Sequence, residues 1–114
     1  MTEEEWVDSL RWLPDEEIIK LHFSLQEKIK KHYRMREKGG NLNRAIEFCK
    51  QQIALSSLAI SALKKNENMY HDGVFFSPSH HGYKQYVVIL KKNKDLGEIS
   101  RIRDKMLEEG WSVK

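Results

Sequence analysis

The feature that most restricts the fold is the stretch over residues 42–63, LNRAIEFCKQQIALSSLAISAL, which contains no helix breaker. Its second half, Ile53 to Leu63, consists only of Ile, Leu, Ala and Ser and carries no charge. A run of this kind predicts a helix that its neighbours bury. At about 1.5 Å per residue the helix would be about 30 Å long, the width of a small domain. We therefore predict an all-α fold in which the other helices pack against a long, central, buried helix.

Chain length and composition are those of one soluble domain. The 114 residues are 39% hydrophobic and 32% charged, which is enough for one core and too little for two. The uncharged run of the central helix is about half as long as a bilayer requires. The N-terminus, MTEEEW, is acidic where a signal peptide would be basic. We expect a single domain over residues 1–114 that is cytoplasmic and makes no membrane contact.

Two amphipathic segments precede the central helix. Residues 3–13 predict a short helix, which Pro14 ends. Residues 15–38 predict a long helix, because its apolar positions recur every three or four residues. Gly39-Gly40-Asn41 then suits a left-handed cap and a tight reversal. Residues 15–65 should form the first antiparallel helical hairpin.

A loop and a second hairpin are expected after the central helix. Residues 66–79 contain turn formers, a glycine and a proline, yet also large apolar groups, so we predict a loop that packs back over the helices. Residues 80–111 predict two further helices joined by a short turn. Ser77 or Ser79 is the expected N-cap of the first of these, and Gly110 the C-terminal cap of the second.

One competing interpretation gives the chain a small β-hairpin. Residues 86–90, YVVIL, are rich in β-branched side chains and could pair with residues 74–76, which would make the fold α+β. The apolar side chains at positions 83, 86, 87 and 90 instead recur with helical spacing. The helical interpretation is therefore preferred.

Two segments resemble units of the tetratricopeptide repeat, a family in which two antiparallel helices meet across a turn that contains glycine. They are AIEFCKQQIALS and GYKQYVVILKKNKDLGEISRIRDKMLEEGW, and the resemblance covers about residues 29–57 and 80–111. Lys94 stands where the family has its turn glycine, and Arg103 where it has an aromatic. The phrase PSHHGYKQ resembles small bacterial proteins of this class. The residues that match are Gly40, Asn41, Leu42, Ala45, Phe48 and Cys49 in the first unit and Tyr83, Tyr86, Leu90, Leu96, Met106 and Leu107 in the second.

This resemblance implies helical hairpins that leave a groove or an end for another chain. The second unit, particularly DKMLEEGW, also resembles a pentatricopeptide repeat, a related family that is associated with RNA binding.

Catalytic and metal-binding patterns are sparse. His71, His80 and His81, with Asp72, could supply metal ligands if the loop folds back, but their spacing matches no defined site. The single cysteine, Cys49, excludes an intramolecular disulfide or a cysteine zinc cluster and is expected to be a small buried side chain. We predict no cofactor, no resident metal and no enzymatic activity.

Basic side chains form two zones, one at the end of the helix over residues 15–38 and one around the last hairpin. If both zones face the same way, these side chains could neutralise the phosphates of a nucleic acid. If they do not, the side chains are an ordinary solvated surface. A small basic nucleic-acid-binding protein is therefore the alternative function. The residues that would carry it are Lys28, Lys31, Arg34, Lys38, Lys91, Lys92, Arg101 and Arg103.

Large aromatic residues exceed what so few helices can easily enclose. Such side chains either cap the core or anchor a partner. We predict a protein-binding adaptor or regulator, with basic residues selecting an acidic partner and a second copy of the chain as a further candidate. The expected anchors are Trp6, Trp12, Phe75, Phe76 and Trp111.

Overall fold

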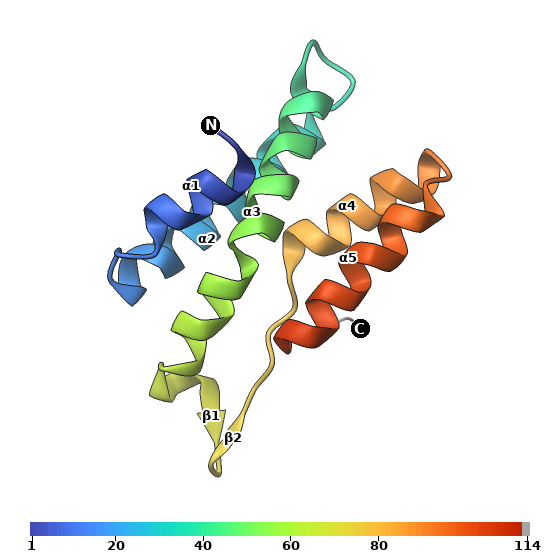
Figure 1. Ribbon diagram of the computed structural model, residues 1–114. Coiled ribbons are helices and arrows are strands. Elements are labelled where there is room, and N and C mark those ends of the chain that lie inside the picture. The colour runs from blue at the N-terminus through green and yellow to red at the C-terminus, as the bar shows by residue number, and fades with distance from the viewer. Residues whose placement is uncertain (113–114) are drawn as a thin grey trace.

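The computed structural model describes residues 1–112, and within them the fold is almost entirely helical (Figure 1). This confirms the all-α prediction, with a very small sheet added. None of the described helices is long and apolar enough to cross a membrane. The elements are α1 (Glu3–Leu10), α2 (Asp15–Arg34), α3 (Asn41–Lys64), the 3-10 helix η1 (Glu67–Met69), β1 (Tyr70–His71), β2 (Val74–Phe75), α4 (His81–Lys92) and α5 (Leu96–Glu109).

α2 and α3 lie side by side and are joined by a short reversal. Acidic residues in the first turn of α2 and basic residues in its last turn match the helix dipole. α2 ends at Arg34, earlier than predicted, and Gly39 has a φ of +51°, a left-handed conformation that glycine adopts without strain. The side chain of Asn41 spans the turn, since it lies 2.8 Å from Nδ1 of His32 and donates to the carbonyl of Lys38.

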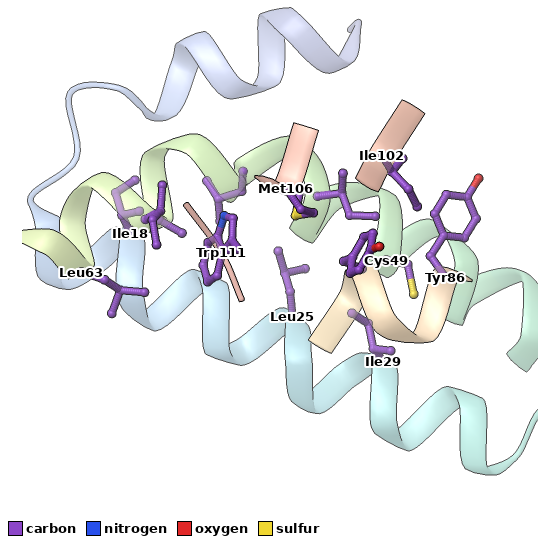
Figure 2. Packing of buried hydrophobic residues seen from close by; sticks show 14 of the residues in the cluster. Ile18, Leu25, Ile29, Cys49, Leu63, Tyr86, Ile102, Met106 and Trp111 are labelled. Atoms are coloured by element: carbon purple, nitrogen blue, oxygen red, sulfur yellow. The ribbon is translucent and has the colours of Figure 1, made fainter. Parts of the chain in front are cut away.

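α3 is the spine of the molecule, as its charge-free sequence predicts. Ala45, Cys49, Leu55 and Ala59 are fully buried along it. The small side chains let α2 and α4 approach closely, and α1 and α5 pack against other parts of the same helix. Figure 2 shows the resulting cluster, in which side chains from α2, α3, α4 and α5 meet. Its labelled members are Ile18, Leu25, Ile29, Cys49, Leu63, Tyr86, Ile102, Met106 and Trp111.

The β-hairpin between α3 and α4 is local, and the alternative pairing of residues 74–76 with residues 86–90 is wrong. β1 pairs antiparallel with β2, with Tyr70 opposite Phe75. Asp72 and Gly73 both have positive φ, the conformation of a tight two-residue hairpin turn. Residues 86–90 belong to α4. A two-residue turn closes a much smaller loop than the longer pairing would, so it costs less chain entropy.

The N-cap of α4 is His80, and the prediction of Ser77 or Ser79 is wrong. Nδ1 of His80 accepts a hydrogen bond from the backbone N–H of Tyr83, at 2.9 Å. Ser79 instead pairs with Ser112, whose N–H donates to the carbonyl of Pro78 at 2.9 Å. Gly110 caps α5 as predicted, with a φ of +94°.

α4 starts beside the middle of α3, and its first turn packs against the side chain of Gln52 (Figure 1). The N–H of Gly82 donates to Oε1 of Gln52 at 2.8 Å. A Cβ atom at position 82 would lie 2.4 Å from that same oxygen, which is less than real contacts allow. A side chain at position 82 would therefore displace the Gln52 amide from its hydrogen bond with the backbone of α4.

Replacing Gly82 with alanine should lower the free energy of unfolding by about 1 to 3 kcal/mol, because the methyl group overpacks the contact with Gln52. The matched control is Gly97→Ala in α5, where a new Cβ would meet no atom within 4 Å. That change should stabilise the protein by about 0.5 to 1 kcal/mol, because alanine is the better helix former. Urea unfolding followed by circular dichroism measures both. Equal or greater stability of Gly82→Ala would show that the contact is loose.

Candidate functional site

A buried polar junction joins α2, α3 and α4. We call it the histidine junction and define it as His22, Gln52, His80 and Trp111, none of which is more than 3% exposed. The Gln52 amide nitrogen donates to the backbone carbonyl of His22 at 3.0 Å, while its oxygen accepts from Gly82. One side chain of α3 thus binds the backbones of both neighbouring helices.

The hydrogen bonds of His80 fix its protonation state. Nδ1 accepts from the backbone of Tyr83, so Nε2 carries the proton and donates to the carbonyl of Gln52 at 3.1 Å. Burial lowers the pKa of His80 to about 3, and the neighbouring His22 also disfavours a charge there. Burial likewise lowers the pKa of His22 to about 4. Both imidazoles are therefore neutral at physiological pH.

Trp111 completes the junction and is not an exposed anchor, contrary to the sequence prediction. Its ring stacks on His22 with centroids 5.3 Å apart and receives the edge of His80 at 4.8 Å. Its indole N–H donates to Glu109 at 3.2 Å, and Ser56 donates to the same carboxylate oxygen. Lys105 forms an ion pair with Glu109. The indole therefore ties the end of α5 to the core.

The three histidines considered as metal ligands do not come together. His80 is buried in the junction, and His71 lies on the exposed β-hairpin, 3.4 Å from Asp72. His81 is only partly buried, and that burial lowers its pKa. Across residues 1–112, no group of three His, Cys, Asp or Glu side chains is placed to hold a metal ion.

The α1–α2 turn and the β-hairpin both lie toward the end of the molecule where α3 ends (Figure 1), and each carries exposed apolar side chains. An ion pair between Lys65 and Asp15, 3.4 Å apart, links the end of α3 to the start of α2 there. We call this region the hairpin end. Its exposed members are Trp12 (78% exposed), Val74 (67%), Phe76 (67%) and Tyr70 (40%).

The other two predicted anchors are partly covered. Trp6 packs against the core from α1. Phe75 lies against the ring of Tyr70, at 5.4 Å, and beneath Nζ of Lys64, at 5.9 Å. Of the five predicted anchors, the structure leaves Trp12 and Phe76 fully available.

Parts of the two predicted basic zones meet at the end of the molecule opposite the hairpin end. Nζ of Lys92, at the end of α4, donates to the hydroxyl of Tyr33, near the end of α2, at 3.2 Å. Arg36 also lies over the Tyr33 ring, 4.5 Å from its centroid. A shallow pocket of about 280 Å³ beside them has Leu42, Ile46 and Ile89 in its lining. We call this region the basic end and define it by two segments. Residues 28–44 cover the last part of α2, the turn and the start of α3. Residues 84–94 cover most of α4 and the residues that follow it.

The remaining predicted basic residues divide between the basic end and α5. Lys31, Arg34, Lys38 and Lys91 are exposed at the basic end. Lys28 lies on the flank of α2, over the ring of Phe48 at 5.5 Å.

The two predicted basic residues that lie on α5, both arginines, are not part of the basic end. Arg101 pairs with Glu98 and lines a separate pocket with Ile53 and Lys105, whereas Arg103 is exposed on α5.

A pocket of about 380 Å³ lies between α1 and α5 over α3. Glu3, Glu4 and Asp8 form one side, Lys105 lies on the other, and Ala54 and Ser57 are among the lining residues. Its lining is mostly charged side chains of surface helices, with no converging set of buried polar groups. It is therefore an open groove between surface helices.

Sequence reasoning missed the polar half of the core. His22 falls four residues after Ile18 and three before Leu25, so it lies on the predicted apolar stripe of α2. Gln52 likewise lies next to Ile53 on the buried face of α3. Both residues have the helical spacing of buried positions, but a prediction that counts only apolar residues does not assign polar residues to the core.

Comparisons with protein-family models, with curated proteins and with solved structures find no match to this chain. The functional assignment therefore depends on the geometry of its surfaces.

Acid should destabilise the fold through the histidine junction. The pKa values of His22 and His80 are lower in the folded protein than in the unfolded chain, so the unfolded chain binds more protons below its pKa of about 6.5. The two histidines therefore make their full contribution to stability above that pH, and this contribution is lost as the pH falls. The free energy of unfolding should drop by about 1 to 2 kcal/mol per histidine between pH 6.5 and 5.

Urea titrations at several pH values measure this dependence. His80→Asn keeps an N-cap oxygen but does not titrate, so it should remove about half of the slope. The control His71→Gln changes an exposed histidine and should leave the slope intact. A stability that does not change between pH 6.5 and 5 would show that the junction accepts charge.

Proposed function

We propose that this chain is a non-catalytic, cytoplasmic adaptor or regulator that binds another protein at its hairpin end. The observation that supports this proposal is the exposure of Trp12, Tyr70, Val74 and Phe76 in one region of a small domain whose core is otherwise well enclosed. Aromatic side chains are the commonest anchors of protein interfaces, because each removes a large apolar area from water when it is buried.

The backbone that carries these side chains is held by hydrogen bonds. The hydroxyl of Tyr70 donates to the carbonyl of Lys64 at 2.6 Å, which ties the β-hairpin to the end of α3. The N–H of Phe76 donates to the carbonyl of Met69 at 2.7 Å, which extends the pairing by one residue. A partner would meet a surface that is already ordered, so less conformational entropy is lost on binding.

The charges beside the anchors are of both signs, because the lysines of the α3 end lie there together with Asp15 and Asp72. Lys64 lies beside Phe75, and Lys65 is exposed although it pairs with Asp15. Charges of this kind at the rim of an interface contribute mainly to orientation and association rate, while the buried aromatics supply most of the affinity. The partner we propose therefore presents an apolar pocket with charged residues of both signs at its edge.

Replacing Trp12 and Phe76 together with alanine should reduce partner binding at least tenfold and leave the helical circular dichroism unchanged, because both side chains are exposed. The measurement is affinity purification of the tagged protein from its native cells, after nuclease treatment and in high salt, with mass spectrometry of what remains bound. Native mass spectrometry of the purified chain tests whether the partner is a second copy.

The matched control is Leu96→Ala with Leu107→Ala, two exposed apolar residues of α5 that should have no effect. Retention of the same partner by the Trp12/Phe76 variant would contradict the proposal. So would the loss of every partner on nuclease treatment.

A further inference from the structure

We propose that the basic end is a second binding site, separate from the hairpin end, which holds the phosphate backbone of nucleic acid. Three observations point to this class of ligand. The basic end carries a high positive charge, most of that charge has no acidic partner on the chain, and the aromatic rings there are already covered.

The fold concentrates charge that the whole chain does not show. Residues 28–44 contain seven basic and one acidic side chain, and residues 84–94 contain four basic and none acidic. These two segments therefore carry a formal charge of +10, against +3 for the whole chain. They are distant in sequence, but the contact between Lys92 and Tyr33 brings their ends together. The remainder of the molecule is net acidic.

Most of this charge has no acidic partner on the chain. Within residues 1–112, Lys30 is the one basic side chain of these segments that forms an ion pair, with Glu27 at 3.7 Å. The exposed side chains of Lys31, Arg34 and Lys91 make no side-chain hydrogen bond or ion pair in the described part of the chain. A concentration of like charge attracts a polyanion at long range and accelerates its association.

The dimensions of the molecule suit a polyanion with closely spaced charges. Its two shorter extents are 28 and 24 Å. Over a length of about 28 Å, one strand of a duplex presents about eight phosphates, and two strands present twice that number. Because the phosphates are evenly spaced, the basic residues of α2, α3 and α4 at this end could contact them at more than one position along the nucleic acid. An acidic peptide offers fewer carboxylates over the same length, because alternate side chains of an extended chain point away.

The aromatic rings at this end and next to it are covered by cations, by histidine or, for Tyr86, by the core. Arg36 and Lys92 lie over Tyr33, and Lys28 and His32 lie against Phe48. The exposed apolar residues here, Met35, Leu42 and Val88, are aliphatic. No ring is left for bases to stack on, so binding should depend on phosphates and not on sequence. A duplex should bind at least as tightly as a single strand.

The experiment measures fluorescence anisotropy of a labelled 20-base-pair duplex of arbitrary sequence, and of its single strand, with the full-length protein. The dissociation constant should rise at least tenfold between 50 and 200 mM salt, as counterion release requires. Arg34→Glu with Lys91→Glu should weaken duplex binding at least tenfold at 50 mM salt. The control, Lys20→Glu with Lys65→Glu, makes the same change in net charge outside the basic end and should alter binding by less than about twofold.

Four results would overturn the proposal. These are failure of the duplex to bind at 50 mM salt, equal weakening by both pairs of substitutions, no weakening by Arg34→Glu with Lys91→Glu, and competition by poly-glutamate as effective as by unlabelled duplex. The last would point to an acidic protein as the ligand. Circular dichroism should show that each variant keeps its helices. The Trp12/Phe76 variant should bind the duplex normally, so the two proposed sites fail or succeed independently.

Discussion

The fold depends on one buried amide. Gln52 projects from the middle of α3 and uses both ends of its side chain, one on the backbone of α2 at His22 and the other on the backbone of α4 at Gly82. A buried amide left without partners would cost several kcal/mol, whereas a satisfied one favours a single arrangement of its neighbours. His80 strengthens the same connection, because it caps α4 and binds the carbonyl of Gln52 itself. The second pair of helices is thereby attached to the first at a defined position.

Both proposed binding surfaces follow from that attachment. Because α4 starts at the middle of α3 and runs toward the end of α2, its last residue, Lys92, reaches Tyr33 and the basic end is assembled. The chain between α3 and α4 projects the other way as the β-hairpin, which carries Val74 and Phe76 away from the core. Trp111 closes the return of α5 against His22. The two proposed surfaces thus lie at opposite ends of the molecule.

Periodicity predicted the helices well, because long amphipathic or uncharged segments carry a strong local signal. Residues 42–63 correspond to α3, Asn41–Lys64, and Gly110 ends α5 as expected. The polar junction could not be predicted this way, since His22 and Gln52 occupy core positions with polar side chains that only their partners explain. Hydrophobicity alone also failed to separate the buried Trp111 from the exposed Trp12. The position of the two basic zones next to each other depends on how the helices pack, and this could not be predicted from the spacing of residues in the sequence.

The central claim, that a neutral histidine junction joins the helices, is tested most directly by NMR of ¹⁵N-labelled imidazoles in the intact protein at pH 5. We predict that His80 is still neutral there, with its proton on Nε2. If His80 instead titrates near pH 6.5, the ordinary value for histidine, or carries its proton on Nδ1, the hydrogen bonds that orient α4 are absent and this account of the fold is wrong.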